Sequence, residues 1–382
     1  MTKNENDDAG IRAVDLGRRR ILSAAGAGAI ASTLGGVLGG ASGSARAAGP
    51  ATLRWGVVGT GGIANSMAPM IQLADGAELS AVSSRHLETA KEFAAQHDIG
   101  NTFDDWRDML AFDGVDAIYV ATPTFVREQI CVAAARAGKH VLGEKPFANL
   151  ASLQRITAAC RDNGVGFMDG THFVHHPRTS QIRATTADRI GWARSLDTAF
   201  EFGLTDANNI RYRPDQEPLG AIGDAGWYNM RAAVEFLAPD AGIAAVSAYM
   251  RRHETTRAAI SGCGVITFSD GSSTTWNCGF ESGALLQDVR IAGAGGAIKF
   301  DDFVHSRPDK PAHYDYLVGA FGGGKSEGFD VPADKPAAAL MFEDFAAMAG
   351  DKTRFEASVH ASERTQTLLD ACWESAVANE AG

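Results

Sequence analysis

A glycine-rich turn is the first feature of this sequence that suggests chemistry. The segment VVGTGGIANS (Val57–Ser66) contains the pattern Gly59-x-Gly61-x-x-Ala64 between an apolar run and a helical pattern. Gly59 permits a tight turn, Gly61 lets the backbone approach a pyrophosphate, and Ala64 permits close helix–strand packing. The pattern therefore predicts a dinucleotide-binding turn at a helix N-terminus, with a turn that binds nothing as the alternative. The predicted cofactor contacts in it are Gly59, Thr60, Gly61, Gly62, Ile63 and Ala64.

The end of the next expected strand indicates which dinucleotide binds. An acidic residue there would bind the ribose hydroxyls of NAD, but Ser84 and Arg85 occupy this place. A hydroxyl and a planar guanidinium are suited to a 2′-phosphate. The sequence therefore predicts NADP.

Three other side chains are placed to react with a substrate. Lys145 follows a strand-like run, at the carboxyl end where doubly wound folds bind ligands. Asp224 and Tyr228 are four residues apart at an expected helix start, so we place both on one helical face.

A histidine cluster, THFVHHP, follows the last expected parallel strand. No cysteine or carboxylate stands at a matching zinc spacing, so we predict no metal. His172 and His176 are candidates for a substrate or nicotinamide contact, with plain packing as the alternative.

The elements around these residues alternate in type between residues 53 and 170. Apolar runs such as LRWGVVG and VDAIYVAT are typical of buried strands, and helical patterns such as LETAKEFAAQH separate them. This alternation predicts a doubly wound parallel sheet, the Rossmann arrangement.

The pattern changes after residue 171, where strand-like runs such as ARSLDTAFEFG and AAISGCGVITF follow one another almost without helices. We predict an open, mostly antiparallel sheet, with a loop at Gly319–Gly328. The fold class is then α/β. The expected parts are a signal segment at 1–47, a Rossmann domain at 48–170, a substrate and oligomerisation domain at 171–350, and a C-terminal helix at 351–382 that packs back on the Rossmann domain.

Five cysteines show no CxxC spacing, and their odd number argues against a full disulfide framework. The segment from Cys263 to Cys278 is typical of a hairpin that turns at Asp270-Gly271, which would place these two cysteines opposite each other. We interpret them as packed thiols, with a disulfide as the alternative.

Taken together, these motifs resemble the Gfo/Idh/MocA oxidoreductase family. The resemblance is carried by the glycine turn, the ATP of Ala121–Pro123, Glu144-Lys145-Pro146 and Asp224-x-Gly226-x-Tyr228, and it extends over residues 53–379. It implies hydride transfer between a nicotinamide and a sugar or polyol carbon. It adds Thr122, Pro123, Glu144 and Lys145 to the expected cofactor contacts. Arg127 replaces the family's usual histidine and is a candidate substrate contact.

The resemblance also implies catalytic roles. Hydride leaves a sugar carbon only as its hydroxyl proton departs, so a general base must lie within hydrogen-bond reach. We expect Tyr228 to be this acid/base and Asp224 to hold a sugar hydroxyl. A Lys145 ammonium about 4 Å from the phenol would lower its pKa by about three units. A core tyrosine with a satisfied hydroxyl is the alternative.

The N-terminus resembles an export signal. GRRRIL (Gly17–Leu22) precedes a weakly apolar run, and Ala45-Arg46-Ala47 fits a small-residue cleavage site. Residues 1–47 are therefore interpreted as a twin-arginine signal, which implies a periplasmic protein without a membrane anchor in its mature form. A spanning anchor is the alternative, but Gly and Ser interrupt the run.

These inferences predict an exported sugar oxidoreductase with tightly bound NADP(H). One aldose is oxidised to a lactone and a second sugar or carbonyl is reduced in a ping-pong cycle, with Gly319–Asp330 or a subunit contact closing the site. The alternatives are an ordinary NADP-dependent sugar or diol dehydrogenase, an NAD(P)-dependent glycosidase acting by oxidation and elimination, and a non-enzymatic sensor. The net charge of −11 argues against nucleic acid as a partner, and we expect a homo-oligomer, a dimer or a tetramer.

Overall fold

The computed structural model describes residues 52–237, 241–305, 310–319, 323–349, 351 and 353–380. Its first part is a six-stranded parallel sheet in the order β3-β2-β1-β4-β5-β6. The strands are β1 (Leu53–Val58), β2 (Ala77–Ser83), β3 (Asn101–Phe103), β4 (Ala117–Val120), β5 (His140–Gly143) and β6 (Phe167–Asp169). The order reverses between β1 and β4, and this switch point is where a doubly wound sheet binds its ligand. The predicted Rossmann arrangement is confirmed.

Helices cover both faces of the parallel sheet. They are α1 (Gly62–Leu73), α2 (Leu87–His97), α3 (Trp106–Ala111), α4 (Thr124–Arg136) and α5 (Leu150–Asp162). Along β1, Trp55 and Val57 pack in one core with α1 and α2, whereas Val58 packs in the other with α3, α4 and α5. This alternation follows from the period of two along a strand.

The second part is an eight-stranded mixed sheet in the order β14-β13-β12-β11-β7-β10-β9-β8, antiparallel except where β10 meets β7. The strands are β7 (Ala193–Gly203), β8 (Ile243–Arg252), β9 (Ala259–Phe268), β10 (Ser273–Gly279), β11 (Glu281–Gly293), β12 (Gly296–Phe300), β13 (Ala312–Val318) and β14 (Lys325–Val331). The predicted open, mostly antiparallel sheet is therefore confirmed.

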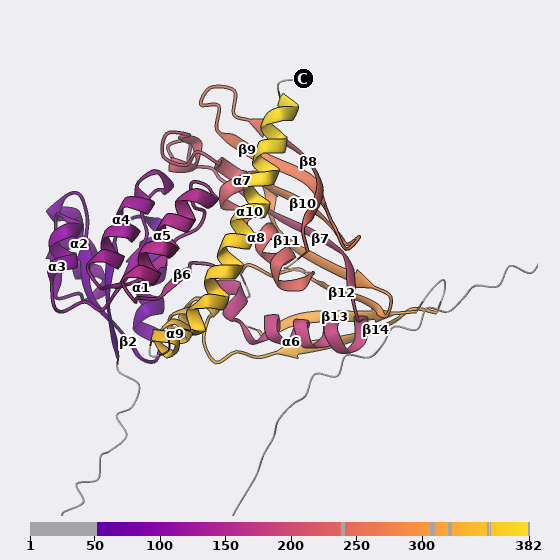
Figure 1. The fold of residues 1–382 in the computed structure, drawn as a ribbon, viewed down its shortest axis with the longest axis horizontal. Helices are drawn as coiled ribbons and strands as arrows, with labels where there is room; N and C mark the ends of the chain where they lie inside the picture. The colour runs from indigo at the N-terminus through magenta and orange to yellow at the C-terminus, as the bar shows by residue number, and fades with distance from the viewer. Residues whose placement is uncertain are drawn as a thin grey trace, which may run out of the picture. The chain divides into compact units, whose positions relative to one another are not determined.

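The remaining helical segments connect the two sheets or lie on the mixed one. They are η1 (His172–His175), α6 (Pro177–Thr185), the π-helical turn η2 (Thr186–Ile190), η3 (Ile210–Tyr212), α7 (Gly220–Asp224), α8 (Gly226–Phe236), α9 (Ala337–Ala349) and α10 (Arg354–Glu380). Figure 1 shows α10, in yellow, running across the mixed sheet beside α8 and on toward α9.

The two C-terminal helices, α9 and α10, contact different parts of the structure, and α9 packs on the parallel sheet although we assigned it to the second domain. Phe342 and Phe345 of α9, which we placed in the second domain, pack edge-on against Trp55 of β1. Helix α10 lies against β8 and α8 and also touches β6 and α5. The short apolar α9 therefore completes one face of the parallel sheet, and α10 joins both parts.

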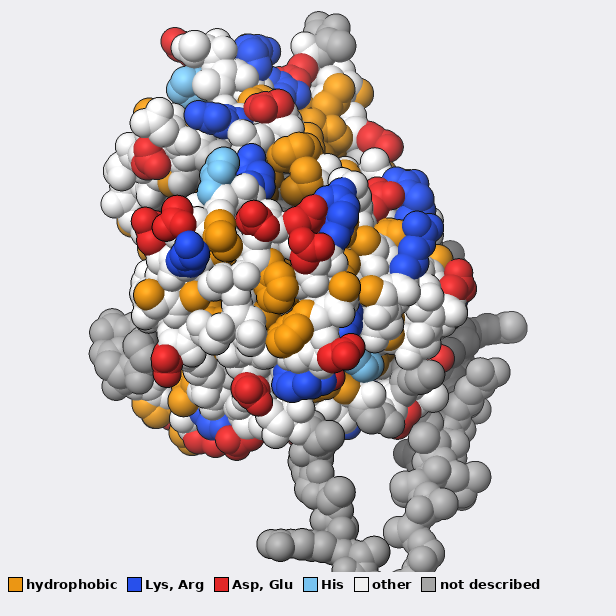
Figure 2. All heavy atoms as spheres, turned by 90° about the vertical axis from the view of Figure 1, so that its left-hand side faces the viewer, with side chains coloured by type: hydrophobic (Ala, Val, Ile, Leu, Met, Phe, Trp, Pro, Cys, Tyr) orange, Lys and Arg blue, Asp and Glu red, His pale blue; other side chains and the backbone are white. Residues whose placement is uncertain are grey.

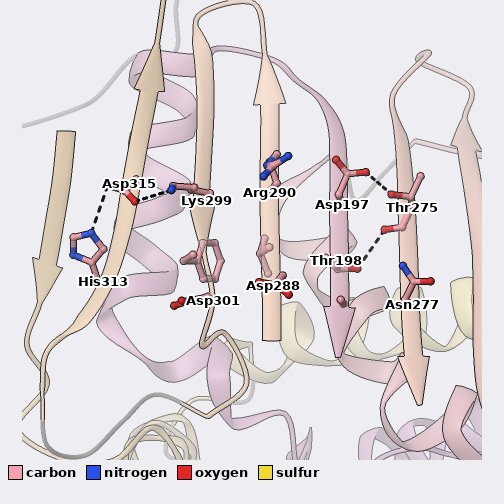
Figure 3. Close-up of a pocket in the computed structure, with 13 residues that line it drawn as sticks. Asp197, Thr198, Thr275, Asn277, Asp288, Arg290, Lys299, Asp301, His313 and Asp315 are labelled. Carbon is pink, nitrogen blue, oxygen red and sulfur yellow. Dashed lines mark hydrogen bonds and ion pairs between the residues drawn. The ribbon is translucent and has the colours of Figure 1, made fainter. Parts of the chain in front are cut away.

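One face of the mixed sheet carries a group of polar side chains (Figure 3). A hollow of about 440 Å³ lies on it, between β7, β10, β11, β12 and β13. Asp315 pairs with Lys299 there, and Asp197 accepts a hydrogen bond from Thr275. Buried and exposed positions alternate along these strands, as in a sheet with one face on the core and the other toward solvent.

Acidic and basic side chains are also interspersed over the side of the molecule formed by the parallel-sheet helices, where hydrophobic side chains gather in a central band (Figure 2). Among the described residues, none of the helices has the length and apolar character needed to cross a bilayer.

Two local predictions are wrong. The first is the expected loop Gly319–Gly328, which is partly strand, because Lys325–Gly328 belong to β14 and pair with β13. These residues are exposed and mostly polar, so this strand at the sheet edge lacks the alternating pattern that marks other strands.

The second wrong prediction is the pairing of Cys263 with Cys278. Cys263 lies opposite Asn277, and Cys278 lies opposite Gly262. The hairpin turn holds three residues, Ser269 to Gly271, because Phe268 N donates to Ser272 O. One extra turn residue shifts the register by one and sends the two side chains to opposite faces.

We predict that one thiol reacts quickly in the folded protein. Cys263 is exposed, whereas the other four cysteines are buried, and burial raises the pKa of Cys160 and Cys372 to about 12. Titration with a thiol reagent under native conditions should label one cysteine per chain, and Cys263→Ser should abolish this fast phase. Fast labelling that survives in Cys263→Ser would contradict the assignment.

Candidate active site

A cleft of about 1330 Å³ connects the parallel sheet to α8 and the mixed sheet. It begins at the turn after β1, passes the carboxyl ends of β4 and β5, and ends against Phe200 and Phe202 of β7. A third wall is the segment 204–219 between β7 and α7, which we call the strap. Most of the predicted site residues line this one cleft.

The glycine turn has the geometry that its sequence predicts. Gly59 has a φ of +109°, and a Cβ placed there would lie 2.7 Å from the carbonyl oxygen of Ala121. A Cβ placed on Gly61 or Gly62 would meet no atom within 4 Å, so the backbone there faces open space. Gly61 caps α1 without any side-chain hydrogen bond, and Ala64 is fully buried against the sheet. The Gly59 amide donates to Ser83 O, which ties the turn to β2, so it is the backbone at Gly61 and Gly62, at the start of α1, that is open to a pyrophosphate.

The strand end at β2 lies beside this turn. The hydroxyls of Thr60 and Ser84 are 3.3 Å apart, and both Ser84 and Arg85 line the cleft. Arg85 is exposed and forms no hydrogen bond or ion pair with the described residues. Its guanidinium is therefore available to an anionic group at this end of the cleft.

Thr122 and Pro123 line the cleft after β4, and the Thr122 hydroxyl is buried without a partner among the described residues. Arg127 is buried nearby. Its guanidinium donates to the carbonyl oxygens of Thr122 and Pro146 and to the Thr124 hydroxyl. Arg127, a candidate substrate contact in the sequence, thus ties two cleft loops together.

Glu144 is a buried carboxyl group at the end of β5. It accepts a hydrogen bond of 2.6 Å from the Tyr119 hydroxyl and a longer one of 3.3 Å from the Lys145 amide. Burial raises the pKa of Glu144. Glu144 lines the cleft, but its carboxyl group is held mainly by protein partners.

Lys145 and Asp224 form the central ion pair. Lys145 Nζ lies 2.6 Å from Asp224 Oδ1 and 3.1 Å from its carbonyl oxygen. On the other side, Arg211 Nε of the strap donates to Asp224 Oδ2 at 2.6 Å. Burial alone would raise the pKa of Asp224, but these two cations outweigh it and hold the pKa well below its usual range. The structure thus gives the carboxylate two cation partners, and its hydrogen bond to a sugar hydroxyl stays a prediction.

Tyr228 lies in the first turn of α8, whereas Asp224 ends α7, so the two do not share one helix face. Tyr228 is 6% exposed, lines the cleft, and its hydroxyl bonds to no described residue. Lys145 Nζ lies 4.8 Å from the centre of the ring. The expected lowering of the phenol pKa is wrong for this arrangement, because burial, then Glu144 and Asp224, raise it. The hydroxyl is therefore protonated at neutral pH.

The histidines separate into two groups. His172 lines the cleft, stacks on His305 at 5.4 Å and lies 6.0 Å from the Tyr228 ring. Burial, with His305 and Lys145 nearby, lowers the pKa of His172 to about 3, so it is a neutral imidazole. His176 does not line the cleft, since its Nδ1 accepts from the Arg178 amide and caps α6. His176 is therefore a helix cap, and of the two candidate histidines only His172 lines the cleft.

Arg211 and His305 are the functional candidates that sequence reasoning missed. Arg211 stands in a single short turn and His305 in a bend, where no periodicity or short motif marks a residue as facing a site. The strap could be located only by its contacts, which include Glu217 with Thr124 and Gln216 with Phe125.

The glycine turn lies at a sheet switch point, next to a lysine and to a tyrosine hydroxyl that bonds to none of the described residues. This combination defines a nicotinamide-dependent oxidoreductase of the Rossmann type. A family model described as "Oxidoreductase family, NAD-binding Rossmann fold" matches residues 53–171. The chain belongs to the Gfo/Idh/MocA oxidoreductase family.

Individual relatives are similar over most of the structure. A dTDP-3,4-didehydro-2,6-dideoxy-alpha-D-glucose 3-reductase of Streptomyces antibioticus is 32% identical over 252 residues, 65% of this chain and 75% of the relative. D-xylose 1-dehydrogenase (NADP(+)) 2 of Haloferax volcanii is 28% identical over 270 residues, 70% and 81% of the two chains. The crystal structure of a 3-ketoreductase from Actinomadura kijaniata with NADP and TDP-benzene matches with a TM-score of 0.76 and 27% identity, covering 84% of this chain and 96% of that one.

We predict different effects of alanine at two glycines of the turn. Gly59→Ala should destabilise the fold by about 1–3 kcal/mol, because its φ is positive and Ala121 blocks the Cβ. Gly61→Ala should leave thermal stability nearly unchanged but weaken NADP binding, because its Cβ enters the space where the pyrophosphate approaches.

Thermal unfolding and nicotinamide fluorescence titration would measure the two effects separately. Gly100→Ala is the control, since this glycine is exposed, lies outside the cleft, and a Cβ there would meet no atom within 4 Å. Equal stability of the Gly59→Ala and Gly61→Ala variants would contradict the prediction.

Proposed function

We propose that this chain is an exported sugar oxidoreductase that retains NADP(H), oxidises an aldose to a lactone and reduces a second sugar or carbonyl in a ping-pong cycle. The observation that carries the proposal is the Tyr228 hydroxyl, which has no described protein partner and lies in a dinucleotide-sized cleft beside Lys145. The 3-reductase and xylose dehydrogenase relatives support both directions of the chemistry.

The residues present fit NADP. The open space at Gly61, the unpartnered Thr122 hydroxyl and the free Arg85 guanidinium would face its pyrophosphate, nicotinamide end and 2′-phosphate respectively. When bound, the nicotinamide supplies the hydride acceptor or donor.

Tyr228 and Lys145 have different roles at the substrate oxygen: Tyr228 transfers a proton and Lys145 stabilises negative charge. In the reductive half-reaction, the protonated Tyr228 hydroxyl donates its proton to the carbonyl oxygen while the Lys145 ammonium attracts the developing negative charge. In the oxidative half-reaction, the deprotonated phenol oxygen, which the reductive half-reaction leaves behind, receives the proton that departs from the sugar hydroxyl. His172 is neutral, so it offers the substrate a hydrogen bond without adding charge.

The proposed export makes cofactor retention necessary. Residues 1–47, which carry the signal prediction, lie outside the described residues. With association near 10⁶ M⁻¹ s⁻¹, retention for a day requires a Kd of about 10 pM. Described residues of Gly319–Asp330 do not line the cleft, whereas seven strap residues do, so we assign closure to the strap. A homo-oligomer, dimer or tetramer, would use the open face of the mixed sheet.

Two other enzyme functions are consistent with the residues of this cleft. An ordinary NADP-dependent sugar or diol dehydrogenase would use the same residues but exchange its cofactor freely with solution after each turnover. A glycosidase that oxidises, eliminates and re-reduces would release an aglycone from a chromogenic glycoside.

The decisive experiment uses the protein as purified from the periplasm, without added cofactor. We expect a bound nicotinamide and a rise in absorbance at 340 nm when D-xylose or D-glucose is added, reversed by a second carbonyl substrate. A protein that is empty but active with added NADP would identify the ordinary dehydrogenase. An empty protein that is inactive with every aldose would overturn the proposal.

We predict that Tyr228→Phe lowers kcat by about 100-fold or more, since a positioned acid/base contributes at least that much. Nicotinamide fluorescence should show that the variant still binds cofactor. In the wild type, aldose oxidation should rise with pH through at least about pH 9, because the Tyr228 pKa is raised. A variant that keeps wild-type kcat would remove Tyr228 from the mechanism.

We predict that Arg85→Asp weakens NADP binding by about 100-fold and NAD binding far less, because a charged hydrogen bond to the 2′-phosphate is replaced by repulsion. Binding titrations with both dinucleotides measure the ratio. Arg136→Asp makes the same charge change on the exposed end of α4 and should alter neither affinity. Equal losses for NADP and NAD would refute the assignment.

A further inference from the structure

Arg211 reaches the reacting centre from outside both sheets. It lies in η3 of the strap and holds the side of the Asp224 carboxylate opposite Lys145. Arg211 Nε donates to Oδ2 at 2.6 Å and Nη2 to Oδ1 at 3.3 Å, while Lys145 Nζ donates to Oδ1 at 2.6 Å. One carboxylate is therefore shared between two cations.

The strap that carries Arg211 is tied to α4 and to its own start. Glu217 accepts from the amide and hydroxyl of Thr124, and the Phe125 amide donates to Gln216 O, which fixes the strap to the start of α4. Tyr212 donates to Leu204 O and closes the strap on itself. The strap therefore positions Arg211 against Asp224 and, through α4, also contacts the dinucleotide-binding half of the cleft.

Sharing the carboxylate has a consequence for Lys145. A lone carboxylate at 2.6 Å would neutralise the ammonium and draw it away from a substrate oxygen. Because Arg211 also occupies the carboxylate, the three groups together keep a net positive charge. The Lys145 and Arg211 side chains are 8% and 34% exposed, so this charge is held in a partly desolvated place where it is effective.

We propose that Arg211 is a positioning residue for the oxidoreductase reaction: it fixes the Asp224 carboxylate so that Lys145 stays beside Tyr228 with its charge directed at the reacting oxygen. The inference rests on the proposed function. It also means that the charged centre is complete only while the strap is seated on α4.

The groups that face Asp224 determine the pH test. They are Arg211 from the strap, Lys145 after β5, Tyr228 on α8 and His305 after β12. Arg211 is the first of the two cations that lower the Asp224 pKa against burial. Removing it leaves burial opposed by Lys145 alone, so the Asp224 pKa must rise.

The test compares Arg211→Met, Arg211→Lys and Arg213→Met with the wild type. Arg213 is exposed, stands two residues away on the same strap and is the matched control. With NADP and whichever of D-xylose and D-glucose the wild type oxidises faster, Arg211→Met should lower kcat about 10- to 100-fold, because the short charged hydrogen bond to Oδ2 and the longer one to Oδ1 are both lost. KM should change less, and an acidic limb absent from the wild type should appear in the pH profile.

Arg211→Lys keeps the charge and should restore most of the wild-type pH profile, and Arg213→Met should match the wild type throughout. A second readout needs no turnover. In protein labelled with ¹³C-aspartate, with the Asp224 carboxyl signal assigned through Asp224→Asn, the titration midpoint should rise in Arg211→Met. Nicotinamide fluorescence should show unchanged NADP binding.

The inference is overturned if Arg211→Met has wild-type kcat. It is also overturned if the activity of this variant falls equally at every pH and the titration midpoint of the Asp224 carboxyl signal is unchanged, because Arg211 would then have only a structural role. Its failure is separable from that of the proposed function. A wild type that turns over no aldose overturns the function, and the Asp224 titration then still decides whether Arg211 controls the carboxylate.

Discussion

The ion pair between Lys145 and Asp224 joins the two halves of this protein at the point where chemistry is expected. Lys145 follows β5 of the parallel sheet, and Asp224 ends α7, which packs on the mixed sheet. Two opposite charges brought this close in a largely desolvated place are stable only if further partners satisfy them. The Asp224 carbonyl and Arg211 of the strap supply these partners, so the geometry of the cleft depends on this pair being complete.

A second buried ion pair holds α8, and with it Tyr228, against the parallel sheet. Asp169 at the end of β6 accepts from Arg231 Nη1 at 2.8 Å and also from Thr171 and Ser362. Arg231 and these hydrogen bonds outweigh the effect of burial and lower the Asp169 pKa, so this carboxylate remains charged inside the protein. Because Asp169, Arg231 and Ser362 come from β6, α8 and α10, the network fixes three elements of different parts of the chain relative to the cleft.

The site combines fixed charges with neutral titratable groups. Asp224 is held ionised, whereas burial keeps His172 neutral and the Tyr228 phenol protonated. A protonated phenol beside an ammonium is suited to donate to a carbonyl oxygen, and the reverse proton transfer becomes easier as the pH rises. One set of residues is therefore suited to both halves of a redox cycle on sugar oxygens.

The sequence by itself determined the parallel sheet, the glycine turn, the place of Ser84 and Arg85 at a strand end, and the choice of Lys145, Asp224 and Tyr228 as reactive candidates. These features rest on local rules: the alternation of strand and helix patterns, the turn that Gly59 permits, and residues that directly follow strands. Only the tertiary structure decided the partners of Asp224, the pKa direction of Tyr228, the separation of His172 from His176 and the register of Cys263. Each of these depends on burial, on one additional residue in a turn, or on a contact such as that between Arg211 and Asp224. Such contacts join segments whose spacing in the chain follows no period and forms no motif, so the sequence alone does not reveal them.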